Sequence, residues 1–186
     1  DSLASHSLLF TNLYATGTRT VRGLEALSLC IPPTPGQSIV RRPNNEQLFS
    51  LGKVFEEKGY DSKYIYGGYG YFDNMNYFFA NNDYEVVDRS SLGEEDIDYE
   101  NVWGVADENL FTLATREIEN TVANGKPVFA DIMTTSNHRP FTYPEGRIDI
   151  PSHSGREGAV KYTDYAIGKF IKSSRGKSWF DNTVFI

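Results

Sequence analysis

The chain has 186 residues, of which 39% are hydrophobic and 23% charged, which is typical of one folded domain with a sizeable core. Its net charge of −7 argues against nucleic acid as a general partner, although a local basic pocket would still admit an anionic substrate. The single cysteine, Cys30, excludes an intrachain disulfide and a cysteine zinc cluster, and no apolar run approaches the roughly 20 residues of a membrane helix.

Strand-like and helix-like segments alternate along the chain. In order, the sequence predicts a strand over 8–14, a helix over 22–30, a helix over 44–58, a strand over 63–66, a helix over 74–80, a strand over 84–87, a helix over 107–123, a strand over 128–133, a helix over 156–172 and a strand that opens at 184. Asn44 and Gln47 have the spacing of a capping box for the helix over 44–58, and Asp107 is the expected cap of the helix over 107–123.

This alternation predicts an α/β fold, with a mainly parallel sheet and helices on both faces. Residues 128–133, VFADIM, are mostly apolar, as expected for a strand buried on both sides. Three polar segments, 15–22, 67–76 and 134–143, each follow a predicted strand, so we expect them to meet at one edge of the sheet. Because strands are predicted at both extremes of the chain, we also expect the 186 residues to belong to a larger domain.

The first polar segment carries the most informative chemistry. It places hydroxyls and two arginines at the start of a predicted helix, where N–H groups favour an anion. Thr20 is the candidate nucleophile; because no base neighbours it in the sequence, we favour a divalent metal as the group that ionises its hydroxyl. The alternative is an ordinary helix cap, which needs no catalytic role.

The third polar segment, TTSNHRPF, follows the predicted buried strand. His138 in it is a candidate hydrogen-bond donor to substrate or a general acid, and a purely structural loop histidine fits the residues equally well. Arg19 and Arg139 are the candidate partners for phosphate oxygens. Most arginines are simply solvated, which weakens the same assignment for Arg22, Arg41 and Arg42.

Four blocks of the chain resemble the lipoteichoic acid synthase family of the alkaline phosphatase and sulfatase superfamily. They are NLYATGTRTVRGLEALSLCIPPTPGQSIVRRP, YIYGGYGYFDNMNYFF, WGVADENLF and DIMTTSNHRPFTYPEG. The resemblance implies an incomplete alkaline-phosphatase-like fold, with residues 1–186 as the central portion of the catalytic domain. It also implies that Thr20 is nucleophile and metal ligand at once, and that His138 contacts substrate.

The same resemblance implies further properties of the parent protein. The metal would be Mn, with Mg or Zn possible, and its remaining ligands would lie outside this chain. The function would be phosphoglycerol (phosphodiester) transfer or hydrolysis, at the periplasmic side of the inner membrane, on a phospholipid-derived or other anionic ester. The membrane anchor would lie outside these residues, and the fragment alone would be inactive. Classical members carry Trp and Arg for the head group where this chain has Asp73 and Met75, which leaves the head group open.

Two alternatives to phosphodiester chemistry remain. One is sulfate-ester hydrolysis, and the other is a non-catalytic ligand-binding module of the same fold. Cys30-Ile31-Pro32 begins like the formylglycine motif of sulfatases, but Thr34 stands where that motif needs arginine, so Cys30 is expected to be a buried helix residue. Residues 17–20 also lack the lysine and the glycine spacing of a phosphate-binding P-loop.

Overall fold

The computed structural model describes residues 3–186; Asp1 and Ser2, which begin the predicted 1–186 portion, lie outside the described residues. Its main sheet contains three parallel strands in the order β2-β1-β5, namely β1 (Asp61–Tyr66), β2 (Glu85–Val87) and β5 (Val128–Met133). In the centre, Lys63 of β1 is in register with Glu85 on one side and Ala130 on the other. A short antiparallel hairpin, β3 (Glu100–Asn101) and β4 (Gly104–Val105), lies outside this sheet.

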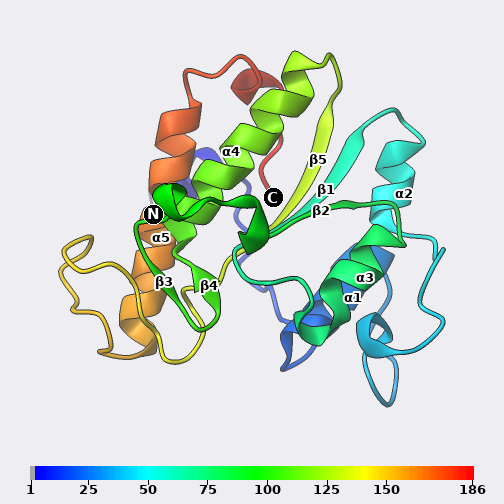
Figure 1. Cartoon of the computed structure of the whole chain (residues 1–186), viewed down its shortest axis with the longest axis horizontal. Helices are drawn as coiled ribbons and strands as arrows, with labels where there is room; N and C mark the ends of the chain where they lie inside the picture. Colours follow the sequence, from blue (N-terminus) through cyan, green and yellow to red (C-terminus); the bar gives the residue numbers. More distant parts are fainter. Residues whose placement is uncertain (1–2) are drawn as a thin grey trace.

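Helices cover both faces of the sheet (Figure 1). The α-helices are α1 (Thr20–Leu29), α2 (Leu51–Glu56), α3 (Met75–Ala80), α4 (Asp107–Ala123) and α5 (Arg156–Ser174). Short 3-10 turns occupy Ala4–His6, Ile39–Arg41, Phe72–Asn74, Arg89–Ser91, Glu94–Asp96 and Phe180–Asn182. The first three α-helices lie on one side of the sheet, α4 lies on the other, and α5 packs outside α4 (Figure 1). The predicted α/β class is therefore confirmed.

The central strand divides the core because successive side chains point to opposite faces. Tyr64 and Tyr66 belong to the cluster under α1 and α3, whereas Ile65 belongs to the cluster under α4. The Tyr64 ring stacks on Phe79 with 3.7 Å between centroids, and both side chains are fully buried. Apolar burial on both faces thus fixes the register of β1 and the direction in which its carboxyl end points.

The predicted helix over 44–58 is wrong in its first half. Asn44 and Gln47 have positive φ values of 57° and 53°, and the helix begins only after Ser50, whose side chain accepts a hydrogen bond from Lys53 N. Buried Asn82 holds the preceding segment, since its Oδ1 accepts from Leu48 N at 2.7 Å and its Nδ2 donates to Asn45 O at 2.7 Å. These tertiary hydrogen bonds replace those that a longer helix would have made.

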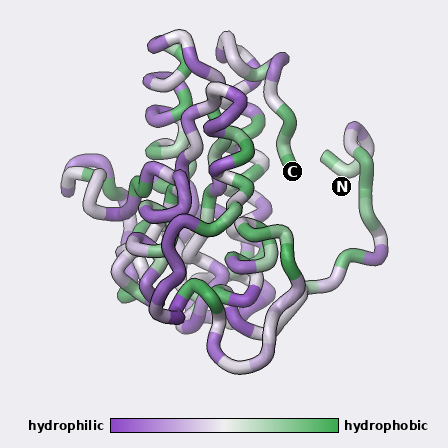
Figure 2. The backbone as a smooth tube through the Cα atoms, turned by 90° about the vertical axis from the view of Figure 1, so that its right-hand side faces the viewer, coloured by the Kyte–Doolittle hydropathy of each residue, from purple (hydrophilic) through white to green (hydrophobic). Residues whose placement is uncertain are grey.

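The strands predicted over 8–14 and from 184 are not formed. Leu8, Leu13 and Tyr14 are each 82% exposed, and the backbone of this apolar segment runs clear of the body of the molecule (Figure 2). A strand needs a hydrogen-bonded neighbour, and within residues 3–186 neither segment has one. Within these residues β5 is an edge strand. Its side chains pack against clusters on both faces, as expected, but each is partly and not fully buried.

Cys30 also differs from its expectation. It is the exposed C-cap of α1, in the left-handed region with φ 55°, and not a buried helix residue. Within residues 3–186, the helices lack the combination of length and apolar character that crossing a bilayer would need.

Candidate functional site

A small pocket opens beyond the carboxyl ends of β1 and β5. Ten residues from five different segments line it: Thr20, Tyr66, Phe72, Asp73, Met75, Trp103, Met133, Thr134, Thr135 and His138. Tyr66 and Met133 are the last residues of the two strands, so the parallel pairing itself brings the following loops together. Ligand sites of parallel α/β sheets form at this edge.

Thr20 lies at the rim of the pocket as the first residue of α1. The preceding residue, Arg19, is the N-cap in extended conformation, with φ −123° and ψ 147°, and the chain turns into the helix directly after it. Thr20 is exposed, so its hydroxyl is accessible to a bound molecule. Partial positive charge at the helix N-terminus would favour an anion beside it.

His138 faces the same pocket from the loop after β5. Its ring lies 3.9 Å from the Trp103 ring between centroids, and its Nδ1 is 2.9 Å from the carbonyl oxygen of Arg139. Because a carbonyl can only accept, Nδ1 is the donating nitrogen in this contact. Nε2 is then the nitrogen that remains for a ligand.

A buried carboxylate holds the loop that carries His138. Asp107 is fully buried, and its Oδ1 accepts hydrogen bonds from the backbone N–H groups of Thr135 and Ser136 at 3.1 and 3.0 Å. Its Oδ2 accepts from the Thr163 hydroxyl at 2.7 Å. Asp107 is the first residue of α4 and not its N-cap, so the predicted cap instead fixes a distant loop.

The Trp103 side of the pocket depends on close backbone packing. Gly104 has φ 140°, and a Cβ placed on it would overlap the carbonyl oxygen of Gly67. Val105 N donates to that same oxygen at 2.9 Å, which ties the hairpin to the end of β1. Sequence reasoning missed Trp103 as a site residue because it lies in a polar acidic stretch; the adjacent glycine was the available signal.

The two arginines predicted to bind phosphate do not line this pocket. Arg19 and Arg139 are both exposed, and in the sequence they directly adjoin the lining residues Thr20 and His138. Their roles stay predictions. Arg41 comes closer to the site, because its Nη1 lies 3.3 Å from Oδ1 of the lining residue Asp73.

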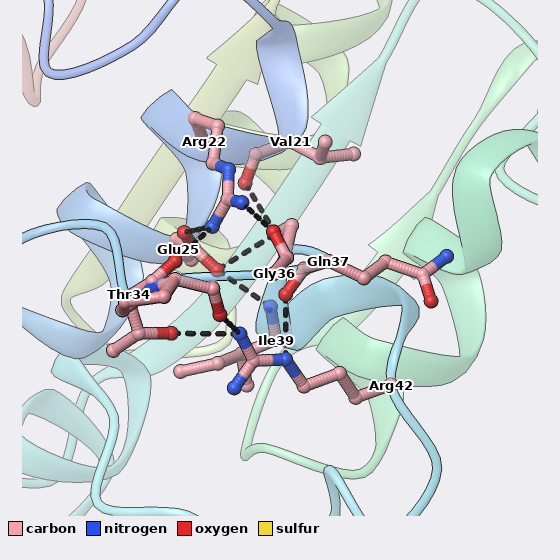
Figure 3. Close-up of polar contacts among 10 residues, drawn as sticks. Val21, Arg22, Glu25, Thr34, Gly36, Gln37, Ile39 and Arg42 are labelled. Atoms are coloured by element: carbon pink, nitrogen blue, oxygen red, sulfur yellow. Dashed lines mark hydrogen bonds and ion pairs between the residues drawn. The ribbon is translucent and has the colours of Figure 1, made fainter.

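The side chains of Arg22 and Arg42 form hydrogen bonds within the protein (Figure 3). Arg22 donates to Glu25 Oε1 at 2.8 Å, to Thr34 O at 2.9 Å and to Gly36 O. Arg42 donates to three acceptors of the same loop, which are Gln37 O, Thr34 Oγ1 and Pro35 O. These contacts fasten residues 34–42 against α1, the helix that carries Thr20.

Fully buried Glu25 is the centre of that network. Burial alone would raise its pKa, but hydrogen bonds from Arg22, from Ile39 N and from the Ser38 hydroxyl outweigh burial and hold the pKa below its usual range. The carboxylate therefore stays ionised and keeps the start of α1 in place.

Two further ionisable groups near the site have shifted pKa values. Burial, with smaller contributions from the charges of Asp73 and Asp88, raises the pKa of Tyr66 to about 12, so its phenol remains protonated at neutral pH. Burial raises the pKa of Asp131, on β5, to about 6.

The described residues do not make a complete metal centre. Between residues 3 and 186, no group of three His, Cys, Asp or Glu side chains is placed to hold an ion. The pocket offers one carboxylate, one imidazole and the Thr20 hydroxyl. These residues fit one or two positions of a metal site and not a whole coordination shell.

Comparisons with known proteins agree with this architecture. The family model described as Sulfatase matches residues 1–186. Lipoteichoic acid synthase 1 of Bacillus subtilis (strain 168) is 25% identical over 160 residues, which are 81% of this chain and 24% of that protein. The crystal structure of a protein in the alkaline phosphatase superfamily from Vibrio parahaemolyticus superposes with a TM-score of 0.87 at 39% identity, over 94% of this chain and 43% of that one.

The lipoteichoic acid synthase LtaP from Listeria monocytogenes shares the fold, with a TM-score of 0.74 at 21% identity over 86% of this chain and 41% of that one. The chain thus spans about a quarter of its curated relative and less than half of the two solved structures. The match over the whole chain shows that it belongs to the sulfatase family, as a lipoteichoic-acid-synthase-like member of the alkaline phosphatase superfamily.

Proposed function

We propose that the protein containing this chain is a phosphodiester transferase or hydrolase in which Thr20 is the nucleophile. The observation that carries the proposal is that Thr20 and His138, which are far apart in the sequence, line one pocket at the ligand-binding edge of the sheet. Similarity to a lipoteichoic acid synthase and to an alkaline phosphatase superfamily protein supports phosphoester chemistry in preference to simple binding.

In the proposed reaction, the Thr20 hydroxyl oxygen attacks the phosphorus of a phosphodiester. The Thr20 hydroxyl releases its proton to solvent, a P–O bond to Thr20 forms, the P–O bond to the leaving alcohol breaks, and the departing oxygen takes a proton. His138 is suited to hydrogen-bond that oxygen through Nε2 and to supply the proton when its ring is charged. Water or an acceptor hydroxyl then attacks the phosphothreonine, which restores the Thr20 hydroxyl and releases the phosphorylated product.

A threonine hydroxyl requires activation, and we propose that it is one ligand of a divalent ion, Mn²⁺ with Mg²⁺ or Zn²⁺ as alternatives. A bound cation would supply a lowered hydroxyl pKa and charge neutralisation at phosphorus. The remaining ligands would lie outside the 186 residues, so we expect the 186-residue chain alone to show negligible turnover.

The proposed substrate is a phospholipid-derived or other anionic ester, with no role for nucleic acid. Net charge of −7 disfavours nucleic acid, whereas the helix N-terminus at Thr20 suits a single phosphate group. We further propose an extracytoplasmic location, on the periplasmic side of the inner membrane, with anchoring through segments outside this chain.

The test uses the protein made from its complete coding sequence. Thr20→Ala should reduce phosphodiester turnover by at least about a thousandfold and abolish a covalent phosphoryl adduct seen by intact mass in wild type. Thr16→Ala, at an exposed position of the same loop, is the control and should change neither readout. Retained turnover by the Thr20→Ala protein would refute the nucleophile assignment, and faster turnover of a sulfate ester by wild type would favour a sulfatase.

A further inference from the structure

Resting on the proposed function, we infer that the pocket selects a zwitterionic head group, in which an ammonium lies close to the phosphate. The juxtaposition that carries this inference is a carboxylate, Asp73, on the same pocket as the aromatic rings of Phe72 and Trp103, with the guanidinium of Arg41 3.3 Å from the carboxylate. Each of these groups matches one part of such a head group.

Asp73 supplies the negative partner. Its backbone is in the left-handed region with φ 51°, inside the turn Phe72–Asn74 that follows β1, and its side chain retains 22% exposure. Oδ1 faces Arg41, and the carboxylate is the pocket's only acidic lining group.

The aromatic walls supply a surface that favours a cation. Phe72 meets Trp103 edge to face, with 5.4 Å between ring centroids, and Trp103 contacts the His138 ring at 3.9 Å. Buried Tyr66 completes the wall from the end of β1. An ammonium beside such rings is attracted by their negative faces, and a nearby carboxylate strengthens its binding.

Arg41 supplies the positive partner for the phosphate. Among the described residues, the lining set contains no Lys or Arg, and the Arg41 guanidinium forms an ion pair with the lining residue Asp73. Its side chain is 42% exposed, and therefore it retains N–H groups for a second acceptor besides Asp73. A zwitterion can bridge this ion pair with each charge next to its opposite.

An uncharged diol is a poorer match to the same groups. Glycerol hydroxyls could donate to Asp73, but they would leave the aromatic faces without a cation and would supply no second charge to the Asp73–Arg41 ion pair. A second anionic group would be repelled by Asp73 itself. The side chains therefore favour an ethanolamine-type or choline-type phosphate over a phosphoglycerol.

A binding measurement tests this inference separately from catalysis. Thr20→Ala protein from the complete coding sequence is titrated calorimetrically with glycerophosphoethanolamine and with glycerophosphoglycerol. We expect about tenfold tighter binding of the ethanolamine compound. Asp73→Asn, added to this protein, should bring the two affinities close together, because asparagine tolerates the left-handed backbone but lacks the charge.

Asp83→Asn is the matched control. Asp83 also has positive φ, 69°, but lies in the turn before β2, at the opposite end of the sheet from the pocket. This substitution removes the same charge and should leave the binding preference at its original ratio. Equal affinities in the parent protein, or a preference that Asp73→Asn does not change, would overturn the inference.

Turnover then distinguishes the inference from the function on which it rests. Vesicles of phosphatidylethanolamine and of phosphatidylglycerol are supplied to the otherwise unmodified protein, and diacylglycerol release is measured above the Thr20→Ala background. Selective binding together with no Thr20-dependent release from either lipid would overturn the proposed function and leave the head-group assignment standing. Thr20-dependent release that favours phosphatidylglycerol would overturn the head-group assignment alone.

Discussion

Asp107 and Ser136 cap each other across two distant parts of the chain. The Asp107 backbone N donates to the Ser136 hydroxyl at 3.2 Å, and the Ser136 backbone N donates to the Asp107 carboxylate at 3.0 Å. The start of α4 is thereby locked to the start of the loop that carries His138, whose backbone N in turn donates to Thr135 O at 3.0 Å. The pair therefore acts on the site through the loop, without lining the pocket itself.

Replacement of Asp107 should weaken both the fold and the positioning of His138. Asp107→Ala removes the acceptor of three hydrogen bonds and should lower the free energy of unfolding by about 2–3 kcal/mol, measured by urea denaturation. In the complete protein, kcat should fall more than KM rises, because His138 is misplaced while Thr20 and the walls formed by Phe72, Asp73 and Met75 remain. Asp164→Asn, on the exposed side of α5, should change neither value; an equal effect of the two substitutions would contradict the positioning role.

Loss of the His138 imidazole should affect turnover and not stability. His138 is exposed, so His138→Asn should leave the thermal midpoint nearly unchanged while kcat falls by about a hundredfold. His153→Asn is the matched control, since His153 is an exposed histidine whose positive φ asparagine tolerates. Full activity of the His138→Asn protein would leave this histidine with a structural role only.

The Glu25 network should make stability sensitive to acid. Because the pKa of Glu25 is lowered by its partners, its contribution is present above the unfolded value of 4.5 and is lost as pH falls through the folded value. Glu25→Gln should therefore cost about 2 kcal/mol at pH 7 and progressively less as pH falls below the ordinary value of 4.5. Chemical denaturation across this range measures it, and a penalty independent of pH would show that packing rather than charge is responsible.

Asp131 should have the opposite dependence on pH. Burial raises its pKa from 3.8 to about 6, so its ionised form is disfavoured in the fold, and stability is lost as pH rises through that interval. Asp131→Asn should raise the free energy of unfolding by about 2–3 kcal/mol at pH 8 and change it little at about pH 3.5. Equal stabilities of the two proteins at pH 8 would contradict the burial argument.

A methyl group at Gly104 should disturb the Trp103 wall. Gly104→Ala combines positive-φ strain with overlap against Gly67 O and should cost about 3 kcal/mol, together with loss of head-group binding. Gly125→Ala isolates the strain, since its φ is 77° and no atom lies within 4 Å of an added Cβ. That control should cost about 1 kcal/mol and leave binding intact, as measured by denaturation and calorimetry.

The sequence pattern predicted the elements whose apolar residues follow a local pattern. The pattern identified β1, β2 and β5 as strands and the two long helices within one or two residues, because alternating or 3.6-residue burial is a local property. It failed for residues 44–49, because hydrogen bonds from Asn82, which lies more than 30 residues away, hold their backbone in a non-helical conformation. It also failed for 8–14, where apolar character suggested a strand but no neighbouring strand is present within residues 3–186.

Part of the site could also be predicted from the sequence. Thr20 and His138 could be proposed because each follows a predicted secondary-structure element near the expected ligand-binding edge, and both line the pocket. Their chemical roles stay predictions. The contribution of Trp103 could not be predicted, since it depends on the close approach of Gly104 to Gly67, which is a tertiary contact without a periodic signal.

The hairpin β3–β4 has a consequence for how such a site diversifies. The Thr20 hydroxyl and the His138 imidazole come from α1 and from the loop after β5, whereas Phe72, Asp73 and Trp103 come from the turn after β1 and from the hairpin. Substitutions in the turn can alter which molecule is admitted without touching Thr20 or His138, whereas substitutions at Trp103 also act on the His138 ring beside it. A change of the turn alone can therefore redirect substrate preference while the residues proposed for the chemical step keep their places.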